Sequence, residues 1–355
     1  MHEKALAKEI PHSVWPDVVK EIKHVKEKFD LQVKIAIVGF GKAGKSTLFN
    51  EMFGENLQET GAQTDLTKSD RQEIRFGAIF TDTRGFGTNF VPLEEIKRVL
   101  DEQHLIIHCI NGMSAISAED LELYRFCKQS SKPVIVAVTK ADVMKEREIT
   151  EYEGSVVQKL GSSSTPIFVS AETGRNMNLL VSRIVALLPE AVRHAFTAKQ
   201  RVNLEIKRDD AKLLIQATAV GAAGVAISPI PLSDVVVLVP MQAGMVVGIA
   251  KIYGYDITTE RAKEVLWVAG GGIVLRYAFQ TLVKFLPGLG SIIGPAIAYG
   301  GTVAIGEAAI MYFESGMKAS PAEITEVYRR AKEIAERNFD RKGIEKSLTQ
   351  LPSGT

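Results

Sequence analysis

One short motif constrains this chain more than any other feature. Residues 39–46 read Gly-Phe-Gly-Lys-Ala-Gly-Lys-Ser and fit the spacing G-x-x-x-x-G-K-S. An apolar run precedes them at residues 35–38, and a helix-forming run follows at residues 47–53. A glycine loop between a strand and a helix is the context that a phosphate-binding loop requires. The motif therefore predicts a nucleotide site, and a chance match in this context is the less favoured alternative.

The residue types in this motif assign separate tasks within the predicted site. Gly39 and Gly44 let the backbone turn tightly, so that its N–H groups and the positive end of the helix dipole face phosphate oxygens. Lys45 would reach the β- and γ-phosphates, and Ser46 would hold Mg²⁺. The expected phosphate contacts are Gly39, Gly41, Lys42, Ala43, Gly44, Lys45, Ser46 and Thr47.

A second motif follows the strand expected at residues 78–81. It reads Asp82-Thr83-Arg84-Gly85, with the spacing D-x-x-G. Asp82 would hold Mg²⁺ through water, and the N–H group of Gly85 would meet the γ-phosphate. Arg84 could act as an arginine finger in cis or in trans, although a solvated loop charge is the favoured interpretation because arginine is mostly exposed.

Two further motifs predict which base is bound. The apolar strand at residues 133–138 runs into Thr139-Lys140-Ala141-Asp142, and the strand at residues 166–169 runs into Ser170-Ala171-Glu172-Thr173-Gly174. Asp142 can accept hydrogen bonds from guanine N1–H and N2–H₂ together, while the stem of Lys140 lies across the ring. An adenine would leave the carboxylate unpaired, which makes a strong filter. The predicted ligands are GTP and GDP, with Mg²⁺.

These four motifs, in this order and each after an apolar strand, resemble a Ras-like GTPase domain. The ending S-A-E-T-G-x-x-x-x-x-L resembles its Era-like branch, and the resemblance covers residues 33–188. It implies that Ser170, Ala171 and Glu172 form the loop whose backbone N–H donates to guanine O6. Thr139 takes a place more often held by Asn. The resemblance also implies Mg²⁺-assisted hydrolysis of GTP.

Two catalytic parts of the family pattern stay open. The segment that closes on the γ-phosphate should carry a threonine that binds Mg²⁺; Thr64 and Thr67 both fit, and Thr67 is preferred. Phe86 stands where Ras-like enzymes place the glutamine that orients the attacking water. Intrinsic hydrolysis is therefore expected to be slow, with a partner protomer or a bound ion completing the site.

The whole-chain composition sets broader bounds. The chain has 355 residues, enough for two domains, and its 43 basic and 42 acidic residues leave a net charge of +1. This balance predicts no DNA partner and argues against RNA or a ribosome. The sequence holds two cysteines, Cys109 and Cys127, which suits a reducing compartment, and the first residues lack a signal-peptide core. A cytoplasmic location is expected.

The predicted fold class is α/β, a doubly wound P-loop GTPase sheet at residues 33–190 with a second, all-helical domain. That domain would be formed by an N-terminal segment, residues 1–32, and a C-terminal segment, residues 200–355. Helices are expected at residues 209–228 and 235–253, as antiparallel partners. Capping patterns at Ser117–Asp120 and Ser320–Glu323 predict two helix starts.

The composition changes beyond residue 201. Residues 213–233 and 285–306 carry no charge over lengths that could span a bilayer. Glycine and proline interrupt both windows, and small residues also permit close helix packing in water. A soluble bundle is preferred, with peripheral contact at the inner face of a membrane left open.

Residues 209–272 resemble the helical domain of unknown function that follows the GTPase domain in some bacterial Era-like proteins. They resemble, more loosely, the helical domain of the immunity-related GTPases of animals. These resemblances imply a homodimer through the GTPase face and association with membranes. The leading hypothesis is a GTP-hydrolysing switch. The alternatives are a GTP-loaded binding module, a ribosome-associated GTPase and a bilayer-embedded protein.

His104 and His108 form one further pair, at i and i+4 of the strand expected at residues 105–110. They would share a face of that strand, but no third metal ligand is visible. Both are therefore predicted to be hydrogen-bonded strand residues rather than ligands.

Overall fold

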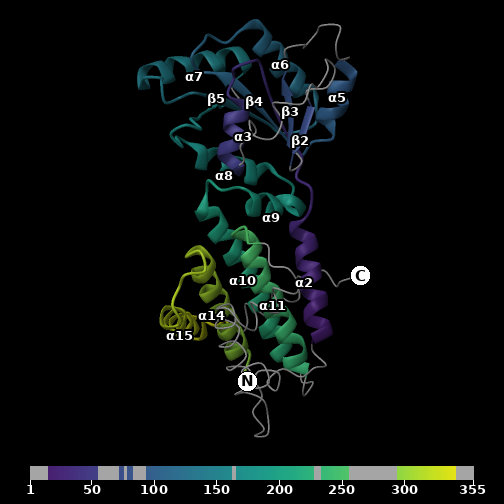
Figure 1. The fold of residues 1–355 in the computed structure, drawn as a ribbon, viewed down its shortest axis with the longest axis vertical. Coiled ribbons are helices and arrows are strands. Elements are labelled where there is room, and N and C mark those ends of the chain that lie inside the picture. The colour runs from purple at the N-terminus through teal and green to yellow at the C-terminus, as the bar shows by residue number, and fades with distance from the viewer. Residues whose placement is uncertain are drawn as a thin grey trace. The chain divides into compact units, whose positions relative to one another are not determined.

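The computed structural model describes residues 15–54, 72–75, 78–82, 93–161, 165–227, 233–255 and 294–340. They belong to two compact units (Figure 1). The first, here called the sheet unit, spans residues 31–206. The second, here called the helical unit, combines residues 1–30 with residues 207–355.

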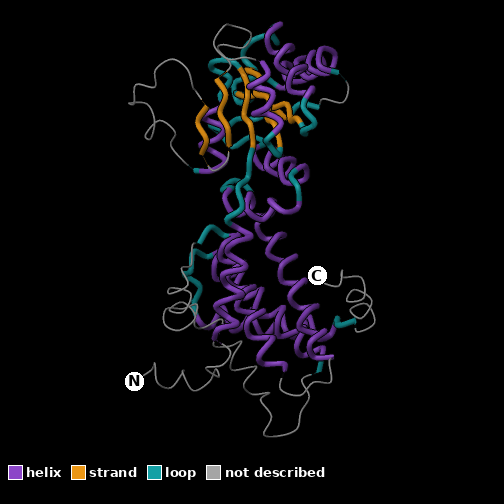
Figure 2. The backbone as a smooth tube through the Cα atoms, turned by 90° about the vertical axis from the view of Figure 1, so that its right-hand side faces the viewer, coloured by secondary structure: helices purple, strands orange, loops and turns teal. Residues whose placement is uncertain are grey.

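Among its described residues, the sheet unit has six strands in the order β2-β3-β1-β4-β5-β6. Figure 2 draws the strands in orange. The parallel strands are β1 (Ile35–Gly39), β3 (Ala78–Asp82), β4 (Leu105–Asn111), β5 (Val134–Thr139) and β6 (Ile167–Phe168). At one edge, β2 (Gln72–Arg75) pairs with β3 in the antiparallel sense. Because parallel neighbours need crossover connections, helices must alternate with these strands.

Helices cover both faces of the sheet. One face holds α3 (Lys45–Phe53), α8 (Met177–Leu187) and α9 (Glu190–Lys199); the other holds α5 (Leu93–Asp101), α6 (Ala118–Gln129) and α7 (Glu146–Leu160). Successive strand side chains point to opposite faces. Ile35 and Ile37 of β1 therefore join the core under α3, while Ala36 and Val38 join the core under α5 and α6. The predicted doubly wound sheet is confirmed.

The sheet unit continues past Pro189 because α9 is part of its core. Val192, Ala195 and Phe196 of this helix are buried with the residues of α3 and α8. The ring of Phe196 meets Phe53 edge to face, with centroids 6.0 Å apart.

Both predicted capping patterns are confirmed. At the start of α6, the Ser117 hydroxyl accepts from the Asp120 N–H at 3.0 Å, and the Asp120 carboxylate accepts from the Ser117 N–H at 3.0 Å. The same reciprocal pair, Ser320 and Glu323, begins α15 (Pro321–Arg337). Each side chain satisfies a backbone N–H that has no partner inside the helix.

The described helices of the helical unit are α2 (Trp15–Phe29), α10 (Leu204–Ile227), α11 (Ser233–Ile252), α14 (Pro295–Glu314) and α15. α10 begins at Leu204, earlier than the predicted Asp209. The side chain of Asn203 explains the difference, because its Oδ1 accepts from the Ile206 N–H at 3.0 Å and so caps the helix.

α10 and α11 are antiparallel, as predicted. Gly221 of α10 faces Met241 of α11. Leu214, which lies earlier in α10, faces Gly248, which lies later in α11. α2 packs on α11, where a Cβ at Gly244 would lie 2.8 Å from the Glu21 side chain (Figure 1). Val18 and Ile22 of α2 are buried in this unit.

Glycine permits close helix contacts elsewhere in the helical unit. A Cβ at Gly306 of α14 would overlap the Ile215 side chain of α10, and one at Gly300 would lie 2.5 Å from the Glu336 side chain of α15. A buried hydrogen bond joins α11 to α14, from Gln242 Nε2 to Thr302 Oγ1 at 2.9 Å. Gly221, Gly244, Gly248, Gly300 and Gly306 therefore permit close packing between helices.

Within the described ranges, α14 is the one helix long and apolar enough to cross a membrane, and 67% of its apolar window is buried inside the structure. A core helix of a soluble protein can have the same length and composition. Length and composition alone therefore do not distinguish a soluble bundle from a membrane span. Residues 228–232 and 285–293 of the two charge-free windows lie outside the described residues.

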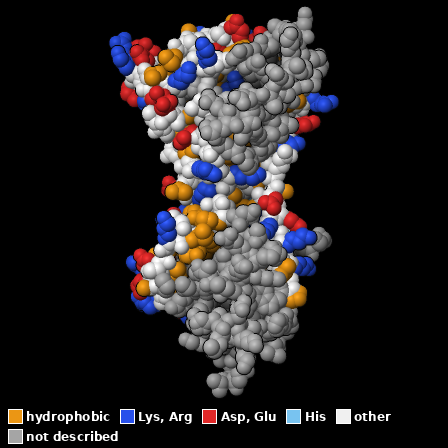
Figure 3. All heavy atoms as spheres, in the orientation of Figure 1, with side chains coloured by type: hydrophobic (Ala, Val, Ile, Leu, Met, Phe, Trp, Pro, Cys, Tyr) orange, Lys and Arg blue, Asp and Glu red, His pale blue; other side chains and the backbone are white. Residues whose placement is uncertain are grey.

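Apolar surface remains on the helical unit (Figure 3). Leu213 of α10 is 66% exposed and Ile334 of α15 is 51% exposed. Ile334 lines a groove of about 460 Å³ between α10, α14 and α15. The apolar residues of α15 thus divide, with Ile324 buried and Ile334 facing this groove.

His104 and His108 differ in their hydrogen bonding. His104 Nδ1 accepts from the Lys34 N–H at 3.0 Å, as expected of a hydrogen-bonded strand residue. His108 of β4 is fully buried and stacks on Tyr124, and neither of its ring nitrogens has a hydrogen-bond partner in the described structure. The prediction of a hydrogen-bonded residue is wrong for His108. Burial lowers the pKa of its imidazole from 6.5 to about 4.

This burial makes the stability of the sheet unit depend on pH. Between the unfolded pKa of 6.5 and the folded value of about 4, the unfolded chain binds a proton that the folded chain excludes, so stability falls as the pH falls. Replacing His108 with Leu should remove about 2 kcal/mol of the loss in unfolding free energy between about pH 7 and about pH 5. Urea titrations of the full chain measure this, with hydrogen exchange of β4 assigning the transition.

The matched control is His24→Gln, at an exposed position of α2. It should leave the pH dependence of the sheet unit as it is in the unaltered chain. If the His108→Leu chain lost as much unfolding free energy between about pH 7 and about pH 5 as the unaltered chain, His108 would not be the source of the pH dependence.

Candidate nucleotide-binding site

The phosphate loop lies where the sequence predicts it. β1 ends at Gly39 and α3 begins at Lys45, so the loop connects the carboxyl end of a central strand to a helix N-terminus. A Cβ at Gly39 would overlap the carbonyl oxygen of Cys109 in the neighbouring strand β4. Glycine is required there because the loop leaves the sheet in contact with this backbone. Gly44 has φ 74°, a left-handed conformation, and precedes the first helical residue.

The start of α3 is suited to an anion. No side chain caps this helix, and its ladder begins with the Leu48 N–H, which donates to the Gly44 carbonyl at 2.9 Å. The N–H groups of the preceding turn are therefore directed at the position that a phosphate would take. Ser46 and Thr47, in that turn, are exposed.

Lys45 lies across the loop. Its Nζ donates to the carbonyl oxygens of Gly39 at 2.7 Å and Phe40 at 3.1 Å. The ammonium is thus held by the loop itself, next to the place of the predicted phosphates. Gly41 and Lys42 are exposed, with Lys42 at φ 65°, while Ala43 is buried and donates its N–H to the Phe40 carbonyl at 3.1 Å.

The predicted Mg²⁺ ligands are only partly described. Asp82 is the last residue of β3 and pairs in register with Gly39 of β1, which places its backbone beside the start of the phosphate loop. Thr64, Thr67, Arg84 and Gly85 lie outside the described residues. No cluster of three or more His, Cys, Asp or Glu occurs in the part of the chain that the structure describes. A site made of Ser46, Asp82 and substrate phosphates is the arrangement that Mg²⁺ commonly takes.

Thr139 connects the two halves of the site. Its side chain is buried, and its hydroxyl donates to the carbonyls of Ala43 at 3.0 Å and Ile110 at 3.2 Å. Ala43 belongs to the phosphate loop, whereas Thr139 begins the base-reading motif. The threonine that replaces the more usual asparagine therefore still fastens one loop to the other.

The base-reading motif continues in a constrained turn. Lys140 has φ 59°, in the left-handed region that few residues other than glycine adopt. The Ala141 N–H donates to the Val169 carbonyl at 3.1 Å, which ties this turn to the end of β6. Asp142 follows and is exposed, so its carboxylate can meet a base.

The third loop closes on itself beside this turn. The Ser170 hydroxyl accepts from the Thr173 N–H at 3.2 Å, and the Ser170 N–H donates to the Arg175 carbonyl at 3.0 Å. Ser170 is buried, Ala171 is half-buried and Glu172 is exposed. The parallel strands thus bring Ala43, Asp142 and Ala171 to loops at the same edge of the sheet.

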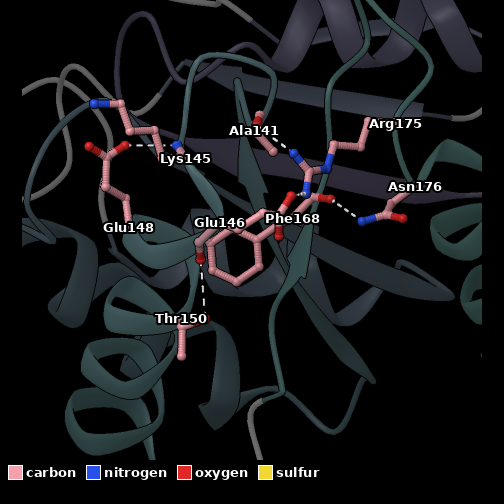
Figure 4. Close-up of polar contacts among 8 residues, drawn as sticks. All are labelled: Ala141, Lys145, Glu146, Glu148, Thr150, Phe168, Arg175 and Asn176. Carbon is pink, nitrogen blue, oxygen red and sulfur yellow. Dashed lines mark hydrogen bonds and ion pairs between the residues drawn. The ribbon is translucent and has the colours of Figure 1, made fainter.

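Two residues of this region were not among the predicted site residues. Asn176 has φ 56° and donates Nδ2 to the Phe168 carbonyl at 2.8 Å. Arg175 donates to the Ala141 carbonyl at 3.2 Å and forms an ion pair with Glu146 (Figure 4). Asn favours left-handed turns, which is a usable signal, but nothing in the sequence points to the crossing made by Arg175.

The cysteine next to the phosphate loop takes no part in the chemistry. Burial raises the pKa of the Cys109 thiol to about 12, and the nearby Lys45 lowers it only in part. The thiol stays neutral at physiological pH and acts as a small apolar side chain.

Comparisons with known proteins agree with this site. A protein-family model described as "50S ribosome-binding GTPase" matches residues 34–140, and one described as "Domain of unknown function (DUF697)" matches residues 192–338. GTPase Era of Thermoanaerobacter sp. (strain X514) is 28% identical over 169 residues, which are 45% of this chain and 56% of that protein.

The sheet unit is similar to the Era-like P-loop GTPases. The match to the domain of unknown function begins within α9 and extends through the described helices of the helical unit from α10 to α15. GTPases of this family bind GTP or GDP with Mg²⁺. GTPase Der of Halothermothrix orenii is 32% identical over 167 residues, 44% of this GTPase and 37% of that protein. The chain spans about half or less of the length of these curated relatives.

Two solved structures are also similar. Era in complex with MgGDPNP and nucleotides 1506–1542 of 16S ribosomal RNA is 22% identical and has a TM-score of 0.36, with 53% of this GTPase and 66% of that chain covered. A probable GTP-binding protein engB is 21% identical, with a TM-score of 0.34 and coverage of 44% and 98%. Scores this low carry no argument about shape.

The prediction that argued against RNA and the ribosome is wrong. The family model that matches residues 34–140 is described as "50S ribosome-binding GTPase", and the similar protein Era has been solved in complex with nucleotides of 16S ribosomal RNA. The net charge of +1 is an average over the whole chain. Contacts with nucleic acid depend on where individual Lys and Arg side chains lie, so a balanced total excludes no ribosomal partner.

The bond from Thr139 to the phosphate loop can be tested by substitution. Thr139→Val keeps the shape but removes the hydroxyl, leaving two buried carbonyls without this donor. We expect the free energy of unfolding of the sheet unit to fall by about 1–2 kcal/mol. GDP affinity, measured by calorimetry, should fall as well because the phosphate loop loses its anchor.

Two further variants make this interpretation specific. Thr139→Asn supplies an amide donor and should retain GDP binding, whereas Thr165→Val, at an exposed position, should change neither quantity. Equal stability and equal affinity in Thr139→Val and Thr165→Val would show that the Ala43 contact has no role.

Proposed function

We propose that this GTPase binds GTP and Mg²⁺ at the carboxyl edge of its sheet, hydrolyses the nucleotide slowly, and uses its helical unit to engage a partner. The observation that supports this most directly is the hydrogen bond from Thr139 to the Ala43 carbonyl, at 3.0 Å. It joins the loop suited to phosphates with the loop suited to guanine. A single nucleotide would contact both loops, as a guanine-nucleotide site requires.

Hydrolysis would use residues that the phosphate loop already positions. Lys45 would exchange the carbonyls of Gly39 and Phe40 for β- and γ-phosphate oxygens, and the N–H groups at the start of α3 would stabilise the charge that develops there. Ser46, Asp82 and Thr67 would hold Mg²⁺, which neutralises phosphate charge. Water attacks the γ-phosphorus as the bond to the bridging oxygen breaks, and GDP and inorganic phosphate leave.

The rate is expected to depend on a group from outside the chain. Phe86 occupies the place of the water-orienting glutamine and has no polar atom with which to replace it. A second copy of the chain could supply the missing group, as the resemblance to immunity-related GTPases suggests. Gly85 and Thr67 would report the γ-phosphate to the rest of the molecule, and Arg84 is a candidate for a group acting in trans.

GTP turnover per molecule should therefore rise with protein concentration. A second protomer that completes the site makes the rate depend on the dimer population, so the specific activity should increase and then saturate. Phosphate release measured over a wide range of protein concentrations tests this. Lys45→Ala serves as the blank, and Lys128→Ala, at an exposed position of α6, serves as the matched control.

The outcomes separate the possible activators. A flat and very low turnover together with normal GTP binding would contradict self-activation. A chain that binds no GTP would overturn the proposed function as a whole. Stimulation by 50S subunits at fixed protein concentration would select the second candidate, a ribosome-associated GTPase, which the description of the matching family model favours.

We also propose a cytoplasmic protein whose helical unit contacts partners or membranes from the surface. The burial of α14 supports this, as do the exposed Leu213 and Ile334 beside the groove of α15. Alkaline carbonate should release any membrane-bound fraction, because surface contacts do not withstand it. Retention in the membrane pellet until detergent is added would instead show a spanning segment.

A further inference from the structure

We propose that Arg175 is a positioning residue for guanine recognition. It holds the backbone of Ala141, and through it Asp142, in the place where the carboxylate reads the base. This inference rests on the proposed guanine-nucleotide site and goes beyond it, because Arg175 lies outside the base-reading motifs and would not itself contact the nucleotide.

The guanidinium of Arg175 connects three segments of the sheet unit (Figure 4). One nitrogen, Nη1, donates to the Ala141 carbonyl at 3.2 Å. The other, Nη2, bonds Glu146 Oε1 at 2.5 Å. The side chain thus runs from the loop after β6 to the turn after β5 and to the first residue of α7.

Both backbone polar groups of Ala141 are hydrogen-bonded. Its N–H donates to the Val169 carbonyl at 3.1 Å, and its carbonyl accepts from Arg175 at 3.2 Å. The preceding Lys140 is in a left-handed conformation at φ 59°, which a residue with a side chain keeps only when its surroundings hold it. The direction in which Asp142 leaves this turn therefore depends on contacts made by the neighbouring loop.

Hydrogen bonds order the backbone both at the start of α7, near Glu146, and in the loop that carries Arg175. At the start of α7, the Glu148 carboxylate accepts from the Lys145 N–H at 2.8 Å and the Thr150 hydroxyl donates to the Glu146 carbonyl at 3.1 Å. In the other loop, the Arg175 carbonyl accepts from the Ser170 N–H at 3.0 Å, and Asn176 is tied to Phe168. The backbone of Arg175 is thus ordered by its own loop, so its guanidinium can hold the Ala141 carbonyl in place.

The chemistry of guanine makes small displacements measurable. Asp142 would accept from N1–H and from the N2 amino group at the same time, which requires both carboxylate oxygens to be placed. Hypoxanthine lacks the amino group and offers only N1–H. The ratio of GDP affinity to inosine diphosphate (IDP) affinity therefore reports the alignment of Asp142, whereas a general loss of folding weakens both nucleotides alike.

The fork geometry of arginine matters at this position. A lysine offers one compact ammonium and cannot direct separate donors at the Ala141 carbonyl and Glu146. The Glu146 side chain is 82% exposed, so the ion pair itself contributes little and is screened by salt. The bond to the Ala141 carbonyl is the part that sets the position of Asp142.

The experiment compares GDP and IDP binding to the full chain by calorimetry. The unaltered chain should prefer GDP by about tenfold or more, the value of one hydrogen bond to a charged group. Arg175→Ala should reduce this preference to about twofold, mainly through weaker GDP binding. Arg175→Lys should give an intermediate ratio, and Glu146→Gln should stay close to the unaltered chain.

Arg183→Ala is the matched control, at an exposed arginine of α8. It should leave the ratio unchanged. An unchanged ratio in both Arg175→Ala and Arg175→Lys, with GDP still bound, would overturn the inference alone. If the unaltered chain binds neither nucleotide, the proposed function is wrong and the inference is wrong with it. If Arg175→Ala does not fold, the Arg175→Lys ratio decides.

Discussion

The parallel direction of the central strands is the constraint on which the site depends. β1, β3, β4, β5 and β6 run the same way, so the residues that follow them all reach one edge of the sheet. No local interaction could bring Ala43 and Thr139 together from so far apart in the sequence. The register does so, and a single hydroxyl then completes the link between them. The apolar strands are needed because a parallel sheet is buried on both faces, and β1 is buried throughout its length.

Backbone groups carry much of the precision of this edge. Gly39 must lack a side chain because the Cys109 carbonyl fills the space, and Ala141 is fixed through its N–H and its carbonyl as well as through its buried methyl group. Lys45 rests on two carbonyls of its own loop. The sequence motifs specify residue types, but main-chain hydrogen bonds largely set the shape of the site. Side chains such as Thr139 and Arg175 act by holding those main-chain groups in place.

The sequence predicts those parts of the molecule in which local chemistry and regular spacing coincide. The phosphate loop, the alternation of strand and helix, and the caps at Ser117 and Ser320 are of this kind, because each depends on neighbouring residues. Other features depend on contacts between distant residues and leave no local pattern. Asn203 extends α10 by capping it, Arg175 crosses between loops, and His108 is buried without a hydrogen-bond partner, whereas His104 accepts a hydrogen bond from the backbone of Lys34. The roles of Thr64, Thr67, Arg84 and Gly85 remain predictions, since these residues lie outside the described ranges.

The helical unit shows why apolar composition cannot separate a bundle from a membrane span. Lipid and a protein core both favour small and apolar side chains, so the same residues satisfy either environment. The contacts made by particular glycines distinguish the two better than hydropathy does. Gly306 faces Ile215 and Gly300 faces Glu336, so positions that would be free to carry larger side chains against lipid are instead occupied by neighbouring helices. A charged side chain such as Glu336, packed over a glycine of α14, is costly inside a bilayer and ordinary at the surface of a soluble bundle. This contact, more than the length of α14, supports the proposal that the helical unit is a bundle rather than a membrane span.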